Sequence, residues 1–186
     1  PGITVDKKEG FVQVAGQELH IVDLPGTYSL TAYSQEELVA RNFLADTRPD
    51  VVVDVANASS LERNLYLAVQ FLEMGAPLVL VLNMIDEARK NGLAIDSDLL
   101  SQRLGVEVLE TVARYGQGKQ ALLKAVQQRG KQTEGDWEPL YISYGPDLDP
   151  VLQEMTEWIE RENFLTDRYP ARWVALKYLE SDDEIR

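Results

Sequence analysis

The sequence predicts an α/β fold in which a mostly parallel sheet carries helices on both faces, followed by a small all-α helical part. Short apolar runs alternate with amphipathic stretches between about residues 50 and 130, and strands buried on both faces of a parallel sheet read as such runs. The longest apolar runs, such as Ala76–Leu82, fall far short of the roughly 20 residues that a membrane helix needs. Cysteine is absent from the 186 residues, which excludes disulfides and thiol catalysis. We therefore expect a soluble piece.

The formal net charge of −13 bears on the partners of this chain. Nucleic acids and anionic membrane surfaces repel such a chain, so we expect neither as a partner. Many acidic residues fall between Glu134 and Glu184, where they form either a solvated surface or a site for a basic partner. The one histidine, His20, alternates with Leu19 and Ile21, which indicates an exposed strand position rather than an iron ligand.

The first fifty residues predict a β-hairpin and one helix. Phe11–Val14 and Leu19–Val22 are short β-like runs separated by residues 15–18, which include a Gly. We expect this antiparallel hairpin to be an edge addition to the parallel sheet. After a Pro-Gly break, a helix is expected from about Ser34 to Ala45, with Ser34 as its N-cap.

Residues 51–128 are expected to hold three buried strands and three amphipathic helices. Apolar, β-branched runs indicate the strands, and apolar residues three and four positions apart indicate the helices. In chain order the elements are Val51–Val55, a helix capped by Ser59 or Ser60 and ending at Gly75, Leu78–Leu82, a helix at Asp96–Leu104 closed by Gly105, Val106–Val112, and a helix at Lys119–Gln128.

A linker and two further helices are expected at the carboxyl-terminal end. Around Gly130–Pro150 the pattern gives way to Gly, Pro, Thr and charged residues, which is typical of a linker. Beyond it, Val151–Glu162 and Ala171–Leu179 are expected as helices. We therefore divide the chain into residues 1–130 and an acidic helical domain, residues 131–186. The three tryptophans, Trp137, Trp158 and Trp173, are expected to pack that helical domain, and a protein-docking patch is the alternative.

Ligands of parallel α/β sheets bind at the carboxyl ends of the strands, and a carboxylate stands at the first such end. Asp23 follows Leu19–Val22 and precedes Gly26 by three residues. An Asp here can reach a magnesium ion through water, and a Gly amide can approach a terminal phosphate unobstructed. Taken alone, this D-x-x-G pattern is also what an ordinary turn shows.

Asn83 and Asp86 follow the strand expected at Leu78–Leu82. The Asp86 carboxylate can accept two hydrogen bonds from the ring N–H and the exocyclic amine of guanine, which adenine cannot offer together. Each charge-assisted bond contributes roughly 1.5–3 kcal/mol. Asn83 would hold neighbouring loops together. Taken alone, the pair also fits a helix start.

Two weaker features complete the pattern. After Val106–Val112, a tight turn at Ala113 and Arg114 can aim the Ala113 amide at a base carbonyl. Before the hairpin, the hydroxyl of Thr4 can coordinate magnesium while its amide meets a γ-phosphate. Each has an unremarkable structural explanation when read singly, and the order of the four features is what decides.

This succession of motifs resembles a translation-factor-type GTPase domain. A closer resemblance is to the amino-terminal domain of ferrous iron transport protein B. The stretches that carry it are Pro1–Val5 running on to Gly10, Val22–Leu30, and Ser60–Leu67 running on to Asn83–Asp86. The Leu-Glu-Arg-Asn-Leu-Tyr-Leu string and the Asn-Met pair are quite specific. The resemblance covers about residues 1–130, and the acidic helices beyond are similar to that family's helical domain, which resembles a built-in regulator of nucleotide dissociation.

The resemblance implies GTP and GDP as ligands with Mg²⁺ as cofactor. Thr4 would lie in the first switch as the candidate catalytic residue and would ligate the metal with Asp23; the second switch would run from Asp23 to about Glu37. The implied nucleotide-binding residues are Gly2, Ile3, Thr4, Val5, Asp6, Asp23, Leu24, Pro25, Gly26, Asn83, Met84, Ile85, Asp86, Val112, Ala113 and Arg114. The family couples GTP binding and slow hydrolysis to ferrous iron uptake by a transmembrane permease domain of the bacterial inner membrane, which is absent from this sequence.

The sequence departs from GTPases in one large respect, because the phosphate-binding G-x-x-x-x-G-K-[ST] loop is missing. Without its Gly-rich cradle, Lys and Ser/Thr, we expect these 186 residues to bind GTP poorly and hydrolyse it negligibly. In the family that loop follows a first, central strand. Unpaired strand edges around Val51–Val55 or Leu19–Val22 are therefore expected to drive self-association, so that a homo-oligomer is one expected form.

Two substitutions bear on the chemistry. Met84 stands where most GTPases carry a Lys over the purine, so we expect weak affinity and fast release of nucleotide. Thr27 stands where many GTPases place a water-orienting Gln, so intrinsic hydrolysis is expected to be slow. Glu36 and Glu37 lie nearby, but a solvated helix start explains both.

Two other functions remain open from the residues. One is a soluble GTPase of ribosome assembly, which would show basic extensions and a Lys within N-K-x-D. The other is an interaction module that does not hydrolyse nucleotide and whose acidic helices dock to a membrane partner. Nucleotide titration and iron uptake in cells distinguish these functions from a transporter GTPase.

Overall fold

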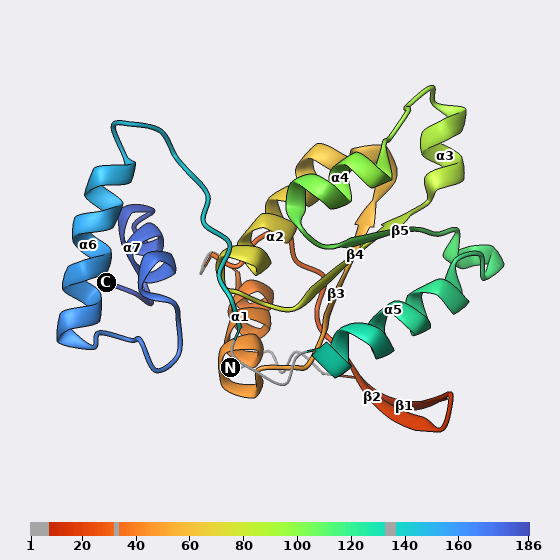
Figure 1. The fold of residues 1–186 in the computed structure, drawn as a ribbon, viewed down its shortest axis with the longest axis horizontal. Coiled ribbons are helices and arrows are strands. Elements are labelled where there is room, and N and C mark those ends of the chain that lie inside the picture. The colour runs from red at the N-terminus through yellow and green to blue at the C-terminus, as the bar shows by residue number, and fades with distance from the viewer. Residues whose placement is uncertain (1–7, 32–33, 133–136) are drawn as a thin grey trace.

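The computed structural model describes residues 8–31, 34–132 and 137–186 (Figure 1). The expected switch residues Gly2, Ile3, Thr4, Val5 and Asp6 lie outside these ranges. The predicted fold class is confirmed: a three-stranded parallel sheet is flanked by helices, and two further helices form the carboxyl-terminal part. None of the helices in the described ranges is both long and apolar enough to cross a bilayer.

The chain begins with the predicted hairpin, formed by β1 (Lys8–Val14) and β2 (Gln17–Asp23). Ala15 and Gly16 turn it with φ of 47° and 81°, as two-residue hairpin turns require. The expected edge addition is wrong, because β1 and β2 form a two-stranded sheet of their own. Within the described ranges no strand lies between β2 and the parallel sheet to connect them. The hairpin instead contacts α5, where Gln127 Nε2 donates to Val14 O at 3.3 Å.

The helix α1 (Gln35–Thr47) forms as predicted, because its amino terminus carries a capping box. Ser34 Oγ accepts from the backbone N–H of Glu37, and the Glu37 carboxylate accepts from the N–H of Ser34. The helix ends at Arg48 in the left-handed region, with φ 45°. Its buried face includes one charged residue, Arg41.

The parallel sheet has the order β3-β4-β5, from β3 (Val52–Asn57), β4 (Leu78–Asn83) and β5 (Glu107–Glu110). Only β4 has a strand on each side, and its residues 78–82 are all buried. The prediction of a third buried strand is partly wrong, since β5 is short and only partly buried. One edge of β3 has no strand partner among the described residues.

Helices cover the sheet from both sides (Figure 1). On one side lie α2 (Leu61–Glu73) and α4 (Ser97–Leu104), and on the other lies α5 (Lys119–Gln132). A short helix, α3 (Ile85–Lys90), follows β4 directly, which agrees with the alternative interpretation of Asn83 and Asp86 as a helix start. Capping of α2 differs from the expectation, because the Ser60 side chain makes no cap bond and a 3₁₀ turn, η1 (Ala58–Ser60), precedes the helix.

The two faces of β3 differ in cover. Val52, Asp54 and Ala56 are buried, whereas Val53 and Val55 are 37% and 57% exposed. Strand residues alternate between faces, so the exposed pair lies on one face of β3. A strand inside a parallel sheet is normally covered on both faces. The described residues thus leave an apolar face and a strand edge of β3 uncovered.

The carboxyl-terminal part consists of α6 (Asp149–Glu162) and α7 (Ala171–Leu179), which pack against each other. Trp173 is buried and stacks on Tyr169 with ring centroids 4.6 Å apart, but Trp158 is 51% exposed. The expectation that it packs this part is therefore wrong, since it lies beside the buried stripe of α6 and not on it.

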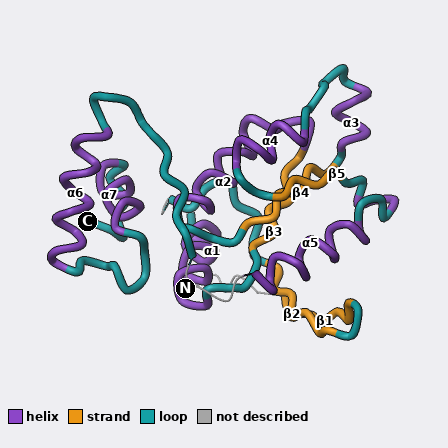
Figure 2. The backbone as a smooth tube through the Cα atoms, in the orientation of Figure 1, coloured by secondary structure: helices purple, strands orange, loops and turns teal. Residues whose placement is uncertain are grey.

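An extended connection leads into α6 along the carboxyl-terminal end of α2, drawn in teal in Figure 2. The backbone N–H of Leu140 donates to Leu72 O at 2.8 Å, and the Tyr144 hydroxyl donates to the Glu73 carboxylate. A Cβ on Gly75 would lie 2.9 Å from the backbone nitrogen of Pro139, so only Gly fits there. The predicted linker is shorter than expected, because α5 extends to Gln132 and α6 begins at Asp149.

Candidate functional site

The loops after β4 and β5 are joined through one side chain, Asn83. Its Oδ1 accepts hydrogen bonds from the Thr111 hydroxyl at 3.1 Å and from the backbone N–H of Ala113 at 3.0 Å. Asn83 is the last residue of β4, and both partners lie just beyond β5. Because parallel strands end at the same edge of a sheet, one amide oxygen fastens both loop tips.

Backbone bonds hold the same two loops in register. The N–H of Thr111 donates to Leu82 O at 2.9 Å, and the N–H of Ile85 donates to Thr111 O at 3.4 Å. Gly118 closes the β5 loop with φ 84°, and a Cβ there would lie 2.6 Å from Glu110 O. The loop can therefore pass this close to the strand only with Gly at that position.

Met84, Ile85 and Asp86 form the turn from β4 into α3. Met84 takes a left-handed conformation, φ 61° and ψ 32°, and Ile85 is buried beneath it in the core. Asp86 lies in the first turn of α3 with 34% of its side chain exposed, and its nearest cation is Lys90 Nζ at 3.8 Å. The carboxylate is thus accessible and only weakly paired, so it can accept hydrogen bonds from a ligand.

The β5 loop presents both backbone groups and exposed side chains. Val112 is buried and bridges to Gln117, while Ala113 and Arg114 are exposed in the turn η2 (Ala113–Tyr115). The Arg114 guanidinium lies 5.8 Å from the centroid of the Tyr115 ring. Of the predicted site residues, the structure therefore brings together Asn83, Met84, Ile85 and Asp86 with Val112, Ala113 and Arg114.

The Asp23–Gly26 segment lies apart from this cluster. Asp23 ends β2 and is exposed, Leu24 packs against the core, and Pro25 and Gly26 lead away from it. Among the described residues, no hydrogen bond or ion pair joins this segment to the loops after β4 and β5. A Cβ on Gly26 would meet none of the described residues within 4 Å, so these residues leave space beside this Gly.

Residues just after Asp23–Gly26 are fixed to α1 and α2, a connection that the sequence did not indicate. The Ser29 hydroxyl donates to Glu37 Oε1 at 2.5 Å, and the N–H of Leu30 donates to Gln70 Oε1 at 2.5 Å. The Arg63 guanidinium lies 3.8 Å from the centroid of the Tyr28 ring. Nothing in the sequence pattern signals these contacts, because their partners lie up to 40 positions apart.

A magnesium ion would find only part of its ligand set in the described residues. No group of three or more His, Cys, Asp or Glu side chains lies close enough there to hold a metal. Mg²⁺ in nucleotide sites is commonly held by one or two protein groups together with phosphate oxygens and water. The exposed carboxylate of Asp23 fits such a role, whereas Thr4 lies outside the described ranges.

An open hollow of about 620 Å³ lies beside these loops, on the α4 side of β5. It contains none of the predicted site residues, and its lining residues are Ala94, Ile95, Asp96, Ser97, Asp98, Val108 and Glu110. The Glu110 carboxylate already accepts hydrogen bonds from the Arg89 guanidinium at 2.5 Å and from the Ser97 hydroxyl at 2.8 Å. The groups around the hollow thus serve to fasten α4 to β5. Sequence reasoning did not identify Thr111, whose hydroxyl follows β5 directly and donates to Asn83.

Comparison with known proteins is consistent with the arrangement of these loops. The family described as ferrous iron transport protein B matches residues 1–126, and the FeoB cytosolic helical domain matches residues 144–186. The chain is 42% identical over 185 residues to an Fe(2+) transport protein A/Fe(2+) transporter FeoB fusion protein of Porphyromonas gingivalis, covering 99% of this chain and 22% of that protein. It is 37% identical to the Fe(2+) transporter FeoB of Escherichia coli, covering 97% of this chain and 23% of that protein.

Solved structures give the same result. The cytosolic domain of the T. maritima FeoB iron transporter in a GDP form matches with a TM-score of 0.85 and 36% identity, covering all of this chain and 71% of that one. An S. thermophilus NFeoB mutant bound to mGDP matches with a TM-score of 0.86 and 38% identity, covering all of this chain and 69% of that one. The chain thus spans less than a quarter of the curated relatives' length. It belongs to the ferrous iron transport protein B family.

Proposed function

We propose that this chain is the guanine-nucleotide-binding part of a bacterial ferrous iron transporter. In the intact protein it binds GTP and GDP with Mg²⁺ and hydrolyses GTP slowly, and this cycle regulates Fe(II) uptake. Relatives with solved structures carry GDP and GMPPNP, which supports the choice of nucleotide. The transmembrane permease domain of the same polypeptide is the proposed partner.

The bridge made by Asn83 carries this proposal. Its two hydrogen bonds hold the turn that bears Asp86 against the turn that bears Ala113. A planar base placed between the two turns would meet a carboxylate on one edge and a backbone N–H on the other. Guanine matches this pair, because its ring N–H and amine donate to Asp86 while its carbonyl accepts from Ala113.

The phosphates and the metal would lie toward Asp23–Gly26. We propose that Asp23 binds Mg²⁺ through water and that the amide of Gly26 meets the terminal phosphate, since a Cβ on this Gly would meet none of the described residues within 4 Å. Thr4 is proposed as a second metal ligand and as the catalytic residue of the first switch. Gly2, Ile3, Val5 and Asp6 are proposed as the other nucleotide-binding residues of that switch.

The phosphate-binding loop itself is proposed to come from a segment outside these 186 residues. The sequence holds no G-x-x-x-x-G-K-[ST] motif. The free edge of β3 and the exposed Val53 and Val55 are what a further strand and helix would cover. The chain on its own would accordingly bind nucleotide weakly.

The contacts of Thr27, which follows Gly26, support the proposal that GTP hydrolysis is slow. Its hydroxyl donates to Ser29 O at 2.7 Å and accepts from the Ser29 N–H at 3.3 Å. A hydroxyl engaged in this local turn does not orient an attacking water as a Gln would. Glu37 is likewise engaged, by Ser29 and Ser34, so it is a poor candidate for a general base.

We also propose that the chain divides functionally at about residue 130. Residues 1–130 hold every proposed nucleotide contact, and residues 131–186 contain the helical pair α6 and α7. A location at the cytoplasmic face of the inner membrane and a homo-oligomeric state belong to the same proposal. Iron uptake by cells that carry the full gene, compared with cells that carry an Asp86→Ala variant, tests the link to transport.

Calorimetric titration of the full-length protein with GDP and with ADP tests nucleotide recognition. Because two charge-assisted hydrogen bonds to Asp86 are lost with ADP, we predict that ADP binds at least about 100-fold more weakly than GDP. Equal affinities for the two nucleotides would contradict the proposal. A matched control is Asp98→Asn, which removes an exposed carboxylate in the first turn of α4, and should leave the preference for GDP unchanged.

A further inference from the structure

A small pocket lies where four parts of the chain meet. Its volume is about 170 Å³, and its walls come from the end of α1, the end of α2, the extended connection before α6 and the loop between α6 and α7. None of the proposed nucleotide-binding residues lines it. The pocket is therefore separate from the loops after β4 and β5.

The inner wall of this pocket is apolar. Met74 and Tyr169 are 2% and 3% exposed, and two prolines also line the pocket. An apolar cavity of about 150 Å³ is large enough to hold a benzene ring. The pocket can accordingly accommodate the apolar body of a small molecule.

The remaining side chains of the lining are cationic or can donate hydrogen bonds. The chain carries 31 acidic and 18 basic residues, yet the pocket is lined by two arginines and by none of the described Asp or Glu residues. The Thr166 hydroxyl and the Trp137 indole N–H have no hydrogen-bond partner within the described ranges. A lining of this kind suits an anion that accepts hydrogen bonds.

Arg48 supplies a cation that no described carboxylate neutralises. It ends α1 in the left-handed region, with φ 45°, and its guanidinium carbon lies 6.0 Å from the centroid of the Trp137 ring. Among the described residues, Arg48 forms no ion pair. A guanidinium binds a carboxylate through two parallel N–H···O bonds, so Arg48 can pair with a carboxylate that enters the pocket.

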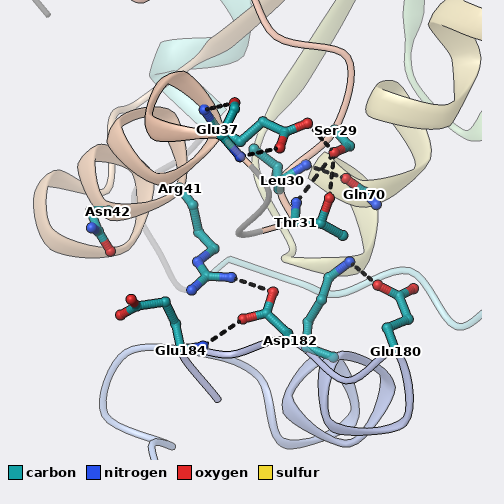
Figure 3. A network of polar contacts seen from close by, with 12 residues as sticks. Ser29, Leu30, Thr31, Glu37, Arg41, Asn42, Gln70, Glu180, Asp182 and Glu184 are labelled. Carbon is teal, nitrogen blue, oxygen red and sulfur yellow. Dashed lines mark hydrogen bonds and ion pairs between the residues drawn. The ribbon is translucent and has the colours of Figure 1, made fainter. Parts of the chain in front are cut away.

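The second arginine, Arg168, is held in place from one side. Its Nε and Nη2 donate to Asp46 Oδ1 at 3.1 and 2.6 Å, and Nη2 lies 3.4 Å from Asn42 Oδ1. These contacts leave Nη1 without a partner among the described residues. Arg41, next to Asn42 on α1, is closed to any ligand, because its Nη1 lies 2.7 Å from Asp182 Oδ2 and the two side chains are 2% and 1% exposed (Figure 3).

We propose that this pocket binds a small organic carboxylate. The carboxylate would lie between Arg48 and Arg168 and accept a further hydrogen bond from Thr166. The apolar body would pack on Met74 and Tyr169. An inorganic anion such as phosphate fits less well, because some of its oxygen atoms would face the apolar inner wall without a donor. The site involves no proposed nucleotide contact and thus goes beyond the proposed function.

Calorimetric titration of the full-length protein with benzoate, at constant ionic strength and without nucleotide, tests the site. Benzamide has nearly the same shape but no charge, so it should bind at least about 10-fold more weakly than benzoate. Inorganic phosphate should also bind more weakly than benzoate. Absence of benzoate binding, or equal affinities for benzoate and either of the other two compounds, would overturn the proposal.

Two variants test where the carboxylate binds. Arg48→Met should weaken benzoate binding at least about 10-fold, whereas Arg103→Met, which removes an exposed arginine in the last turn of α4, should bind as the wild type does. Benzoate should change the tryptophan fluorescence of the wild type, and Trp137→Phe should lose that change. Unaltered affinity in Arg48→Met, or a fluorescence change that persists in Trp137→Phe, would also overturn the proposal. The comparison of benzoate with benzamide needs only the wild type, so it judges the site even if a variant fails to fold.

Discussion

The side-chain Oδ1 of Asn83 lies 3.0 Å from the backbone nitrogen of Ala113, 30 positions later in the chain. The same oxygen accepts from the Thr111 hydroxyl. One short side chain thereby adds two hydrogen bonds to the backbone bonds that already join the loops after β4 and β5. We expect the shape of the proposed base pocket to depend on this contact.

Replacing Asn83 by Ala is expected to loosen both loops and weaken GDP binding. Losing two hydrogen bonds of about 1 kcal/mol each predicts a loss of roughly 10- to 30-fold in affinity. Titration with a fluorescent GDP analogue measures it. Asn91→Ala, at the exposed end of α3, is the control and should leave affinity unchanged; an equal loss in both variants would refute the role of Asn83.

Gly118 and Gly116 provide a matched pair in the β5 loop. Both have positive φ, but a Cβ on Gly118 would meet Glu110 O at 2.6 Å while one on Gly116 meets nothing within 4 Å. Gly116→Ala should lower the free energy of unfolding only through backbone strain, by roughly 1 kcal/mol. Gly118→Ala adds a clash with the backbone and should lower the free energy of unfolding by about 3 kcal/mol or more. Urea unfolding compares the two, and equal costs would contradict this account of the loop.

Asp54 should make stability depend on pH. Burial raises the pKa of its carboxyl from 3.8 to about 6, and its Oδ2 has no hydrogen-bond partner among the described residues. The folded protein then holds this proton more tightly than the unfolded chain does. The contribution of Asp54 to the free energy of unfolding therefore falls as pH rises from about 4 to 6, by up to about 3 kcal/mol.

Asp54→Asn should remove that loss, because the amide stays neutral at every pH. The variant is expected to exceed the wild type in stability at pH 7 and to match it near pH 4. Denaturant unfolding at several pH values measures the difference, and Asp50→Asn at an exposed site is the control. A wild type and variant with parallel pH profiles would show that the Asp54 carboxyl is not perturbed.

The uncovered face of β3 should drive association of the 186-residue chain. Val55→Lys places a charge on this face, which is 57% exposed at that position, and should shift the chain toward monomer in sedimentation experiments. Val151→Lys on α6, at a site 44% exposed, is the control and should leave association as in the wild type. A wild-type chain that stays monomeric at high concentration would contradict the prediction.

The sequence pattern predicts the elements well where a local signal exists. Ser34 with Glu37 marks the start of α1, Gly105 marks the end of α4, and the apolar run Leu78–Leu82 marks the buried strand. Such signals lie within a few residues of the feature they define. The motif at Asn83–Asp86 belongs to the same class, since it directly follows a strand.

The remaining features depend on distant partners, which the pattern does not reveal. Whether the hairpin joins the parallel sheet depends on what lies beside β3, and the short helix α3 has too few residues to show a periodicity. Arg41 reads as an ordinary helix charge until Asp182, 141 positions away, is seen beside it. From the sequence alone, Trp158 and Trp173 are both expected to pack in the core. Only the packing of α6 on α7 shows that the Trp158 ring is exposed and the Trp173 ring is buried.

Recognition of the guanine edge by Asp86 is tested most directly by changing the base that the protein prefers. Asn in place of Asp86 offers one donor and one acceptor, which fits xanthine, because xanthine carries a carbonyl where guanine carries its amine. We predict that Asp86→Asn, in the longest protein that the gene encodes, binds xanthosine diphosphate more tightly than GDP, whereas the wild type prefers GDP. A variant that retains the wild-type preference for GDP would contradict the account.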